Sequence, residues 1–221
     1  VKKNILISMS ENLFELYGFS EGFATMLKPY DQEKKFGSVG TPVLGFEIKI
    51  IDEEGKECSS NIAGEIAGYG AGMMKEYYGE VELTNSLIWT DNRGRSFIKS
   101  GDIGSLDEDG FLTILDRKKD MIISGGLNVF PVDIEEVVGK HPDIIDVTDI
   151  GIPHEKWGET CIALIIPKDG VEIDCDEIKN WSNEKLAKHQ RLYKVESREE
   201  FPRNALGKVL KRVLREPYWS H

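Results

Sequence analysis

Apolar and polar residues alternate over short stretches in the first half of the chain. Between Phe46 and Ile50 every second residue is apolar, which is the period of a half-buried strand. Similar short segments predict strands at residues 64–67, 97–98, 103–106 and 111–115. The Asp-Glu-Asp-Gly sequence at 107–110 separates the last two and is typical of a hairpin turn. The first half of the chain is therefore predicted to form mostly antiparallel sheet with long glycine-rich connections.

The pattern changes after Asp116. Residues 117–120 form a charged run with little apolar anchoring, and we place a domain boundary there. Beyond it, strands and helices are predicted to alternate. Helical spacing indicates helices over 131–138, 174–188 and 207–215, and strands are expected over 144–152 and 160–167. The predicted fold class is α+β, with a β-rich region at 1–118 and a small α+β domain at 119–221.

Composition and charge exclude several classes of protein. The 221 residues are 40% hydrophobic and 30% charged, with 22 Gly and 8 Pro, which is typical of a globular chain. No apolar run approaches the roughly 18 residues of a transmembrane segment. With 28 basic and 39 acidic residues the formal net charge is −11, so we expect no nucleic-acid partner. Any anion must be held by a few placed cations.

Cysteine and histidine positions bear on compartment and metal binding. Cys58, Cys161 and Cys175 form no CxxC pair, which favours a reducing, cytoplasmic location. The four histidines show no HExxH spacing, so the sequence gives no support for a protein-bound transition metal. The chain begins at Val1 rather than Met, has no signal-peptide pattern and runs directly into an apolar segment at 5–7. We therefore expect a fragment of a longer protein.

One short motif suggests a hydrolase. Residues 18–22, Gly-Phe-Ser-Glu-Gly, match the GxSxG turn that exposes a nucleophilic serine. A serine hydrolase also needs an acid and a histidine downstream; His154 and His189 are available, but the spacing selects neither. A structural glycine-rich turn is the simpler interpretation of this segment alone.

Four motifs read together point elsewhere. They are YGFSEG at 17–22, SGDIG at 100–104, LDRKKDMIISGGLNVFPVDIE at 115–135 and PRNALGKVLKR at 202–212. In this order and spacing the chain resembles the C-terminal part of the adenylate-forming acyl-CoA synthetases, relatives of the luciferases and of peptide-synthetase adenylation domains. YGFSEG resembles the family's YGxTE, with Ser20 in place of threonine, so the resemblance also accounts for the GxSxG match.

The resemblance implies a two-step reaction that uses ATP, Mg²⁺ and CoA. A carboxylate, here expected to be a fatty or aromatic acid, attacks the α-phosphate of ATP to give acyl-AMP and pyrophosphate. The CoA thiol then displaces AMP. Three alternatives stay open: an acyl-AMP ligase that passes its acyl group to a carrier protein, a noncatalytic binding module and the GxSxG hydrolase.

The family's residue roles carry over to matching positions in the large domain and in the loop near the C-terminus. The resemblance implies that Lys208 contacts the carboxylate and the α-phosphate in the first step, where an anion attacking an anion requires positioned positive charge. Asp102, expected in a Ser-Gly-Asp turn, would accept from the ribose hydroxyls. Glu21 would bind Mg²⁺, Ser20 would contact phosphate and Tyr17 would lie near adenine.

The remaining matches concern the boundary and the second step. Arg117 matches a nucleotide-contacting arginine, and Lys119 matches the hinge about which the small domain turns between half-reactions. Gly125 and Gly126 match the loop that lines the pantetheine tunnel, although a structural turn is also compatible with them. On this resemblance, residues 1–118 are the C-terminal segment of the large AMP-binding domain and 119–221 the mobile domain.

One family element has no counterpart in the sequence. The Ser/Thr/Gly-rich phosphate loop that ends in lysine belongs to a larger N-terminal region, which also supplies most of the acyl pocket, and no stretch of this chain resembles it. The chain alone is therefore expected to be inactive and to need that region as a partner.

Overall fold

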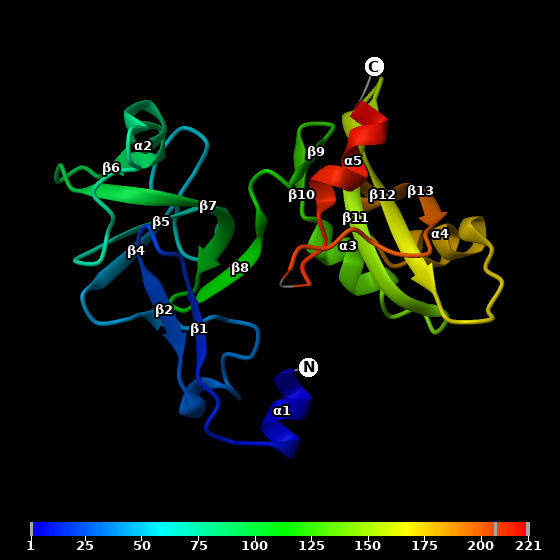
Figure 1. The fold of residues 1–221 in the computed structure, drawn as a ribbon, viewed down its shortest axis with the longest axis horizontal. Coiled ribbons are helices and arrows are strands. Elements are labelled where there is room, and N and C mark those ends of the chain that lie inside the picture. The colour runs from blue at the N-terminus through cyan, green and yellow to red at the C-terminus, as the bar shows by residue number, and fades with distance from the viewer. Residues whose placement is uncertain (1, 206, 220–221) are drawn as a thin grey trace. The chain divides into compact units, whose positions relative to one another are not determined.

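The computed structural model describes residues 2–205 and 207–219, with side chains from residue 5 onward. The chain separates into two compact units, residues 1–118 and residues 119–221 (Figure 1). Each unit has its own clusters of buried apolar side chains.

The first unit contains two antiparallel sheets. It begins with α1 (Lys2–Ser8), and its first sheet has the order β1 (Glu15–Gly18), β2 (Ala24–Leu27), β3 (Thr41–Pro42), with the short 3-10 helix η1 (Pro29–Asp31) between β2 and β3. In the second sheet the strands lie in the order β4 (Phe46–Ile51), β5 (Gly64–Gly70), β7 (Ser96–Leu106), β6 (Ile88–Thr90), and β8 (Leu112–Arg117) pairs with β7. Helix α2 (Val81–Leu87) precedes β6. The β-rich prediction for this half of the chain is confirmed.

A phenylalanine ring that packs on a glycine joins the turn after β1 to the second sheet. Phe23 is buried in a cluster with Ile48 and Ile66. Its ring lies against Gly68 of β5, where an added Cβ would be 1.8 Å from the nearest ring carbon. Gly68 thus leaves the space that lets Phe23 fix the 18–23 turn on the sheet.

Strand β7 corrects one prediction at the site. Residues 97–98 and 103–106 are not separate strands with a turn between them, because β7 runs without a break through Asp102, which pairs with Arg117 of β8. Gly101 has a φ of +72°, and the register against β5 shifts in this region, so the extra residues form an irregularity within the strand. The predicted hairpin at 107–110 is present, and Asp107 Oδ1 accepts from the backbone N–H groups of Asp109 and Phe111.

The second unit is a mixed sheet covered by helices. Its elements are β9 (Ile122–Ser124), β10 (Leu127–Val129), α3 (Pro131–Val138), β11 (Ile144–His154), β12 (Gly158–Pro167), α4 (Cys175–Asn183), the 3-10 helix η2 (Lys188–Gln190), β13 (Leu192–Ser197) and α5 (Lys211–Trp219). The strand order is β10-β9-β12-β11, and β13 pairs with β12 in parallel. The predicted α+β class is confirmed.

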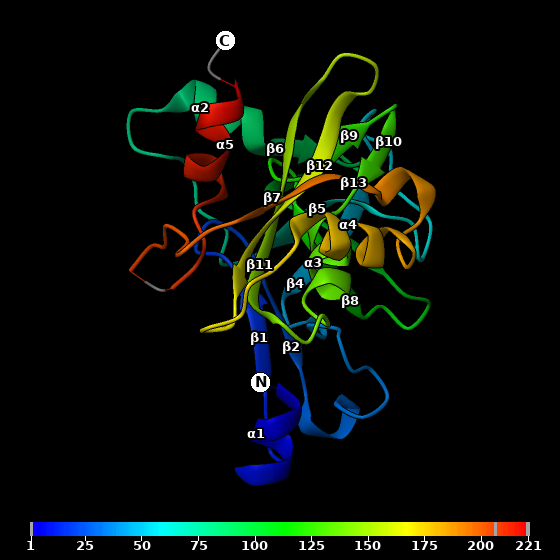
Figure 2. The same cartoon turned by 90° about the vertical axis from the view of Figure 1, so that its right-hand side faces the viewer.

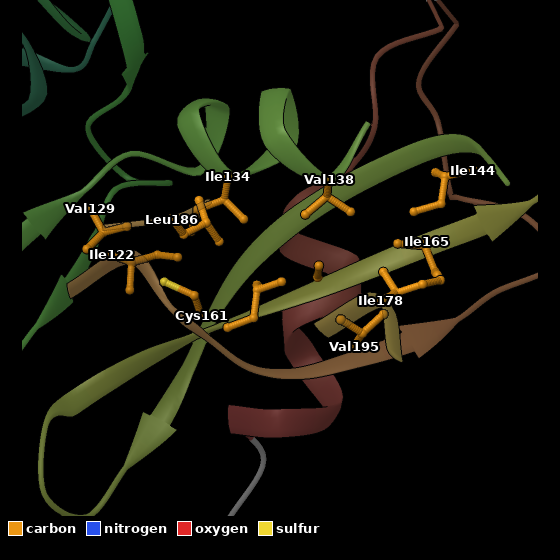
Figure 3. Close-up of a cluster of buried hydrophobic side chains, with 12 residues drawn as sticks. Ile122, Val129, Ile134, Val138, Ile144, Cys161, Ile165, Ile178, Leu186 and Val195 are labelled. Atoms are coloured by element: carbon orange, nitrogen blue, oxygen red, sulfur yellow. The ribbon is translucent and has the colours of Figure 1, made fainter. Parts of the chain in front are cut away.

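Alternating residues of β12 face two different helix layers. Cys161, Ala163 and Ile165 lie in the buried cluster that includes α3 and α4, as Figure 3 shows for Cys161 and Ile165. Ile162 and Leu164 lie in a second cluster that packs against α5. Since successive strand residues point to opposite faces, α3 and α4 cover one face of the sheet and α5 covers the other (Figure 2).

A half-buried carboxylate helps to hold α5 on this sheet. Glu196 Oε2 accepts from the Tyr218 hydroxyl at 2.7 Å and from Arg198 Nη2 at 2.6 Å, and Lys194 Nζ lies 2.9 Å from Oε1. Burial opposes ionisation of Glu196, but these hydrogen bonds outweigh burial and lower its pKa to about 2. The ionised carboxylate therefore joins β13 to the last turn of α5.

Three predictions for the second unit are wrong in part. Strands and helices do not simply alternate, because β9–β10 and β11–β12 are antiparallel pairs with no helix between them. Asp174 lies at the N-cap of α4, where its carboxylate accepts from two backbone N–H groups. The helix ends at Asn183 rather than 188, and the Asn183 side chain exchanges two hydrogen bonds with the Leu192 backbone. Helix α5 begins at Lys211 rather than 207, because Val209 pairs with Arg203.

Three further observations concern the cysteines, membrane-spanning helices and clusters of metal-binding side chains. All three cysteines are free thiols. Among residues 2–205 and 207–219, no helix is long and apolar enough to cross a membrane. Within these same ranges, no group of three or more His, Cys, Asp or Glu side chains is placed to hold a metal ion.

Candidate active site

Three of the predicted site residues meet around one carboxylate in the first unit. Asp102 is largely buried, and its Oδ2 accepts from the Tyr17 hydroxyl at 2.7 Å. Its Oδ1 lies 2.9 Å from Arg117 Nε, and its backbone N–H donates to Ser100 Oγ. The three residues come from β1, β7 and β8. Pairing of β7 with β8 brings Asp102 beside Arg117, and the packing of Phe23 on Gly68 brings β1 close to them.

The electrostatics of this cluster keep the tyrosine protonated. Burial raises the pKa of Tyr17, and the hydrogen bond to Asp102 and the nearby carboxylate charge raise it further. Tyr17 is therefore a donor to Asp102. Oδ2 accepts a hydrogen bond from Tyr17 and Oδ1 forms an ion pair with Arg117, and both oxygens have further acceptor capacity, so Asp102 can also accept from a pair of hydroxyls.

A second carboxylate lies in the turn between β1 and β2. Glu21 Oε1 accepts from the Tyr77 hydroxyl at 2.8 Å, and Oε2 accepts from Ser20 Oγ at 3.1 Å. The bond from Tyr77 lowers the pKa of Glu21, and the same bond raises the pKa of Tyr77. The Glu21 carbonyl also accepts from the Met74 N–H at 2.8 Å. Glu21 is thus an oriented, ionised carboxylate.

The donor set at Glu21 can be compared with what Mg²⁺ requires. Mg²⁺ in nucleotide sites takes one or two carboxylates, with phosphate oxygens and water completing six ligands. Glu21 supplies one ionised carboxylate whose Oε1 and Oε2 each accept one protein hydrogen bond. This arrangement fits a metal carried mainly by the phosphates of a nucleotide.

Lys208 lies in a tight turn of the second unit. The Gly207 N–H donates to the Asn204 carbonyl, and the Asn204 N–H donates to the Lys208 carbonyl, both at 2.9 Å. Gly207 has a φ of +81°, which is the left-handed conformation that such a turn requires of the residue before Lys208. The Lys208 side chain is exposed.

The backbone changes its hydrogen-bond partners at the predicted hinge. In the first unit, the Lys118 N–H donates to the Gly101 carbonyl at 2.9 Å, and Lys118 Nζ donates to Glu65 Oε2 at 2.7 Å. In the second unit, the Lys119 carbonyl accepts from Arg215 Nη1 at 2.7 Å, and Arg215 Nη2 donates to the carbonyl of the next residue. The change falls at the peptide between Lys118 and Lys119.

Gly125 and Gly126 form the two-residue loop of the β9–β10 hairpin. Their φ values of +59° and +80° fit a type I′ turn, so the turn itself requires residues that tolerate the left-handed region. The Gly125 N–H donates to the Trp157 carbonyl, and a Cβ on Gly125 would lie 2.9 Å from the Trp157 ring. A Cβ on Gly126 would meet no heavy atom of the described chain within 4 Å.

A pocket of about 460 Å³ adjoins this hairpin. Basic, aromatic and small polar side chains line it, and His154 contacts Tyr193 edge to face at 5.4 Å between ring centroids. The lining residues are Ser124, Gly125, Leu127, His154, Trp157, Thr160, Lys188, His189, Arg191 and Tyr193. Lys188 and Arg191 supply two cations, and Trp157 and Tyr193 supply aromatic surfaces. This combination suits an anionic ligand that carries a ring system.

The sequence missed several residues that the structure connects to the site. Tyr77 lies 56 residues from Glu21 in a segment without periodic pattern, and the pocket's basic residues lie in η2 and directly before β13. The neighbouring tyrosines at 77 and 78 differ sharply in environment, because the second is fully exposed. No sequence pattern distinguishes them.

Comparison with known proteins identifies the family. Residues 3–78 match the model of the AMP-binding enzyme family, and residues 133–208 match that of the AMP-binding enzyme C-terminal domain. The chain belongs to the adenylate-forming, AMP-binding enzyme family.

Individual relatives align over most of this chain. It is 37% identical over 205 residues to the 2-succinylbenzoate–CoA ligase of Geobacillus kaustophilus, covering 92% of this chain and 41% of the relative. It is 35% identical to a long-chain-fatty-acid–CoA ligase of Salmonella typhimurium, covering 92% of this chain and 36% of the relative. ATP-bound MatB from Rhodopseudomonas palustris superposes with a TM-score of 0.84 at 35% identity, covering 93% of this chain and 40% of that protein. The chain thus spans about 40% of the length of such relatives.

Proposed function

We propose that this chain is part of an ATP-dependent acid–CoA ligase that forms acyl-AMP and then transfers the acyl group to CoA. The observation that carries the proposal is the Tyr17–Asp102–Arg117 cluster, in which a largely buried carboxylate at the centre of the SGDIG motif is oriented by two side chains. The similar proteins named as CoA ligases support the same reaction. Their substrates include an aromatic and a long-chain acid, which is why we propose a fatty or aromatic carboxylate as substrate.

In the first half-reaction, the first unit binds the nucleotide. Asp102 accepts from the two ribose hydroxyls, Arg117 contacts the nucleotide beside it, and Tyr17 orients the carboxylate while its ring lies near adenine. Ser20 contacts phosphate. Lys208 supplies the positive charge that stabilises the carboxylate as it attacks the α-phosphate, because the two anions repel each other and a cation beside both offsets that repulsion.

Glu21 is the proposed protein ligand of Mg²⁺. The bound ion neutralises charge on the phosphates, and the residues of this chain orient its carboxylate ligand. The hydrogen bond from Tyr77 both fixes the Glu21 carboxylate and keeps it ionised.

In the second half-reaction, the pocket beside Gly125 binds the phosphorylated nucleotide end of CoA. Lys188 and Arg191 supply the cations, and Trp157 and Tyr193 supply aromatic surfaces for the adenine. The pantetheine arm then passes along the Gly125–Gly126 turn. Lys119 acts as the hinge for the change between the two half-reactions.

The alternatives differ in their support. A carrier protein in place of CoA would not need a pocket with this chemistry. The hydrolase interpretation is disfavoured because residues 1–118 contain no histidine and the Ser20 hydroxyl donates to the Glu21 carboxylate rather than to an imidazole. A noncatalytic module would bind the nucleotide without converting it, and only an activity measurement distinguishes it from a ligase.

The first experiment is carboxylate-dependent exchange of labelled pyrophosphate into ATP by the full-length enzyme that contains this chain, across short, long and aromatic acids. Exchange with one class of acid establishes adenylation and identifies the substrate class. Lys208→Ala should reduce the exchange by about 100- to 1000-fold, the effect of losing a transition-state charge partner. CoA-dependent release of AMP then separates a CoA ligase from a carrier-protein ligase. No exchange with any acid by the wild-type enzyme would contradict the proposal.

A further inference from the structure

An arginine five residues before Lys208 connects the lysine turn to the central sheet. Arg203 Nη1 donates to the Gly207 carbonyl at 2.6 Å, and its Nη2 makes an ion pair with Asp146 Oδ2 on β11. The carbonyl that Arg203 holds belongs to the peptide that links Gly207 to Lys208. The guanidinium therefore bridges the strand and the backbone directly before the lysine.

The strand end of this bridge is itself well fixed. Asp146 Oδ1 accepts from the Val147 N–H at 2.9 Å, so the carboxylate is oriented toward Arg203. Asp146 pairs with Ile166 of β12, which places it in the β11–β12 ladder of the second unit. By contrast, residues 203–205, 207 and 208 of the turn are exposed, and their other described bonds join turn residues to one another.

This bridge is poorly explained by stability. The Arg203 and Asp146 side chains are 41% and 33% exposed, and ion pairs with that much solvent contact contribute little to folding free energy. The planar guanidinium instead fixes geometry, because it donates in two directions at once and a lysine cannot do so in the same way. Fixing the 207–208 peptide limits where the Lys208 ammonium can reach.

We propose that Arg203, anchored by Asp146, is a positioning residue for Lys208 in the adenylation step. The inference rests on the proposed function, in which Lys208 acts in the first half-reaction. Arg203 does not itself touch the substrate. It acts by holding the peptide that carries the lysine, so its loss should affect adenylation and leave acyl transfer from preformed acyl-AMP intact.

The test measures both half-reactions separately in the full-length enzyme that contains this chain. Arg203→Ala should reduce pyrophosphate exchange by about 10- to 100-fold, the scale expected when a catalytic group is displaced by an ångström. Thioester formation from supplied acyl-AMP should change by less than about 2-fold. Asp146→Asn should give a smaller loss in the same step, and Arg203→Lys should restore part of the exchange because one of the two bonds can be remade.

The matched control is Arg212→Ala. Arg212 is the same residue type four positions after Lys208, with a side chain that is 85% exposed and paired with Glu216 on its own helix. This variant should keep wild-type exchange. A Lys208→Ala, Arg203→Ala double variant should be no slower in exchange than Lys208→Ala alone, because both changes act through the same ammonium group.

The outcomes separate the inference from the proposed function. Suppose that the wild-type enzyme catalyses pyrophosphate exchange and that Arg203→Ala does so as fast as Arg212→Ala. This result would overturn the inference and leave the proposed function standing. Equal losses in both half-reactions would also overturn it, because a general structural defect predicts that result. No exchange by the wild-type enzyme with any acid would overturn the proposed function and the inference with it.

Discussion

Asp102→Asn tests the central contact of the proposed nucleotide site. The substitution preserves the size of the side chain and one carbonyl acceptor, but it removes the negative charge. In the structure this charge faces the Tyr17 hydroxyl at 2.7 Å and Arg117 Nε at 2.9 Å. The side-chain volume at residue 102 is almost unchanged, so the difference in affinity between nucleotides with and without the ribose hydroxyls reports on the acceptor itself.

The expected size of the effect follows from the type of hydrogen bond. A hydrogen bond to a charged group has a net worth of about 1.5–3 kcal/mol, against about 0.5–1.5 kcal/mol for a neutral one. Two ribose hydroxyls donating to the carboxylate therefore predict a total loss of about 2 kcal/mol, which is roughly a 30-fold increase in Kd for ATP.

The assay is calorimetric titration of ATP and of 2′,3′-dideoxy-ATP into the wild-type and Asp102→Asn forms of the full-length enzyme. The wild-type enzyme should bind the dideoxy nucleotide much more weakly than ATP. The variant should discriminate between the two nucleotides by a much smaller factor, because the acceptor for the hydroxyls is weakened. Asp109→Asn, at an aspartate whose side chain is 71% exposed in the β7–β8 turn, is the matched control and should leave both affinities unchanged.

One result would refute this reasoning. If Asp102→Asn weakened ATP and dideoxy-ATP by the same factor, the carboxylate would act through Tyr17 and Arg117 or through folding, and the ribose contact would be wrong. Thermal unfolding of both variants shows whether the fold is intact, since weakening the contacts of a largely buried carboxylate also lowers stability.

The remaining predictions concern three other positions. Glu196→Gln should destabilise the second unit by about 1–2 kcal/mol at pH 7, because a carboxyl pKa that folding lowers to about 2 contributes stability above the unfolded-state pKa of about 4.3. In urea unfolding the difference from wild type should shrink as the pH falls from about 4 toward 2, and a pH-independent difference would contradict this. Tyr77→Phe should raise the Mn²⁺ concentration needed for half-saturation of the ATP complex about 3- to 10-fold by electron paramagnetic resonance, since one hydrogen bond orients Glu21, whereas Tyr78→Phe should not. Gly126→Ala should slow thioester formation about 10-fold while adenylation changes less, and equal losses in the two steps would argue against the tunnel role.

Local patterns predicted the regular elements well. Strand β4 follows its alternation, and α3 starts at the proline that the helical spacing placed in its first turn. Errors arose where backbone geometry, rather than residue type, decides the outcome. Gly101 interrupts the alternation of β7, yet its positive φ is accommodated inside the strand, and the sequence alone made Asp102 a turn residue. Likewise Val209 has helical spacing with later residues but pairs with Arg203 instead.

Motifs predicted the residues of the candidate site but not the contacts between them. The contacts were missed because the residues that meet lie far apart in the sequence. Tyr17 and Asp102 are 85 residues apart, and their hydrogen bond depends on the register of β7 against its neighbours and on Phe23 fitting over Gly68. A motif fixes which side chain is present, but a one-residue change of register would turn Asp102 to the opposite face of the sheet. The irregularity at Gly101 is therefore part of the site, because it sets the residue of β7 that faces Tyr17. A substitution at Gly101 that disfavours positive φ should then act on Asp102 even though residue 101 has no side chain to lose.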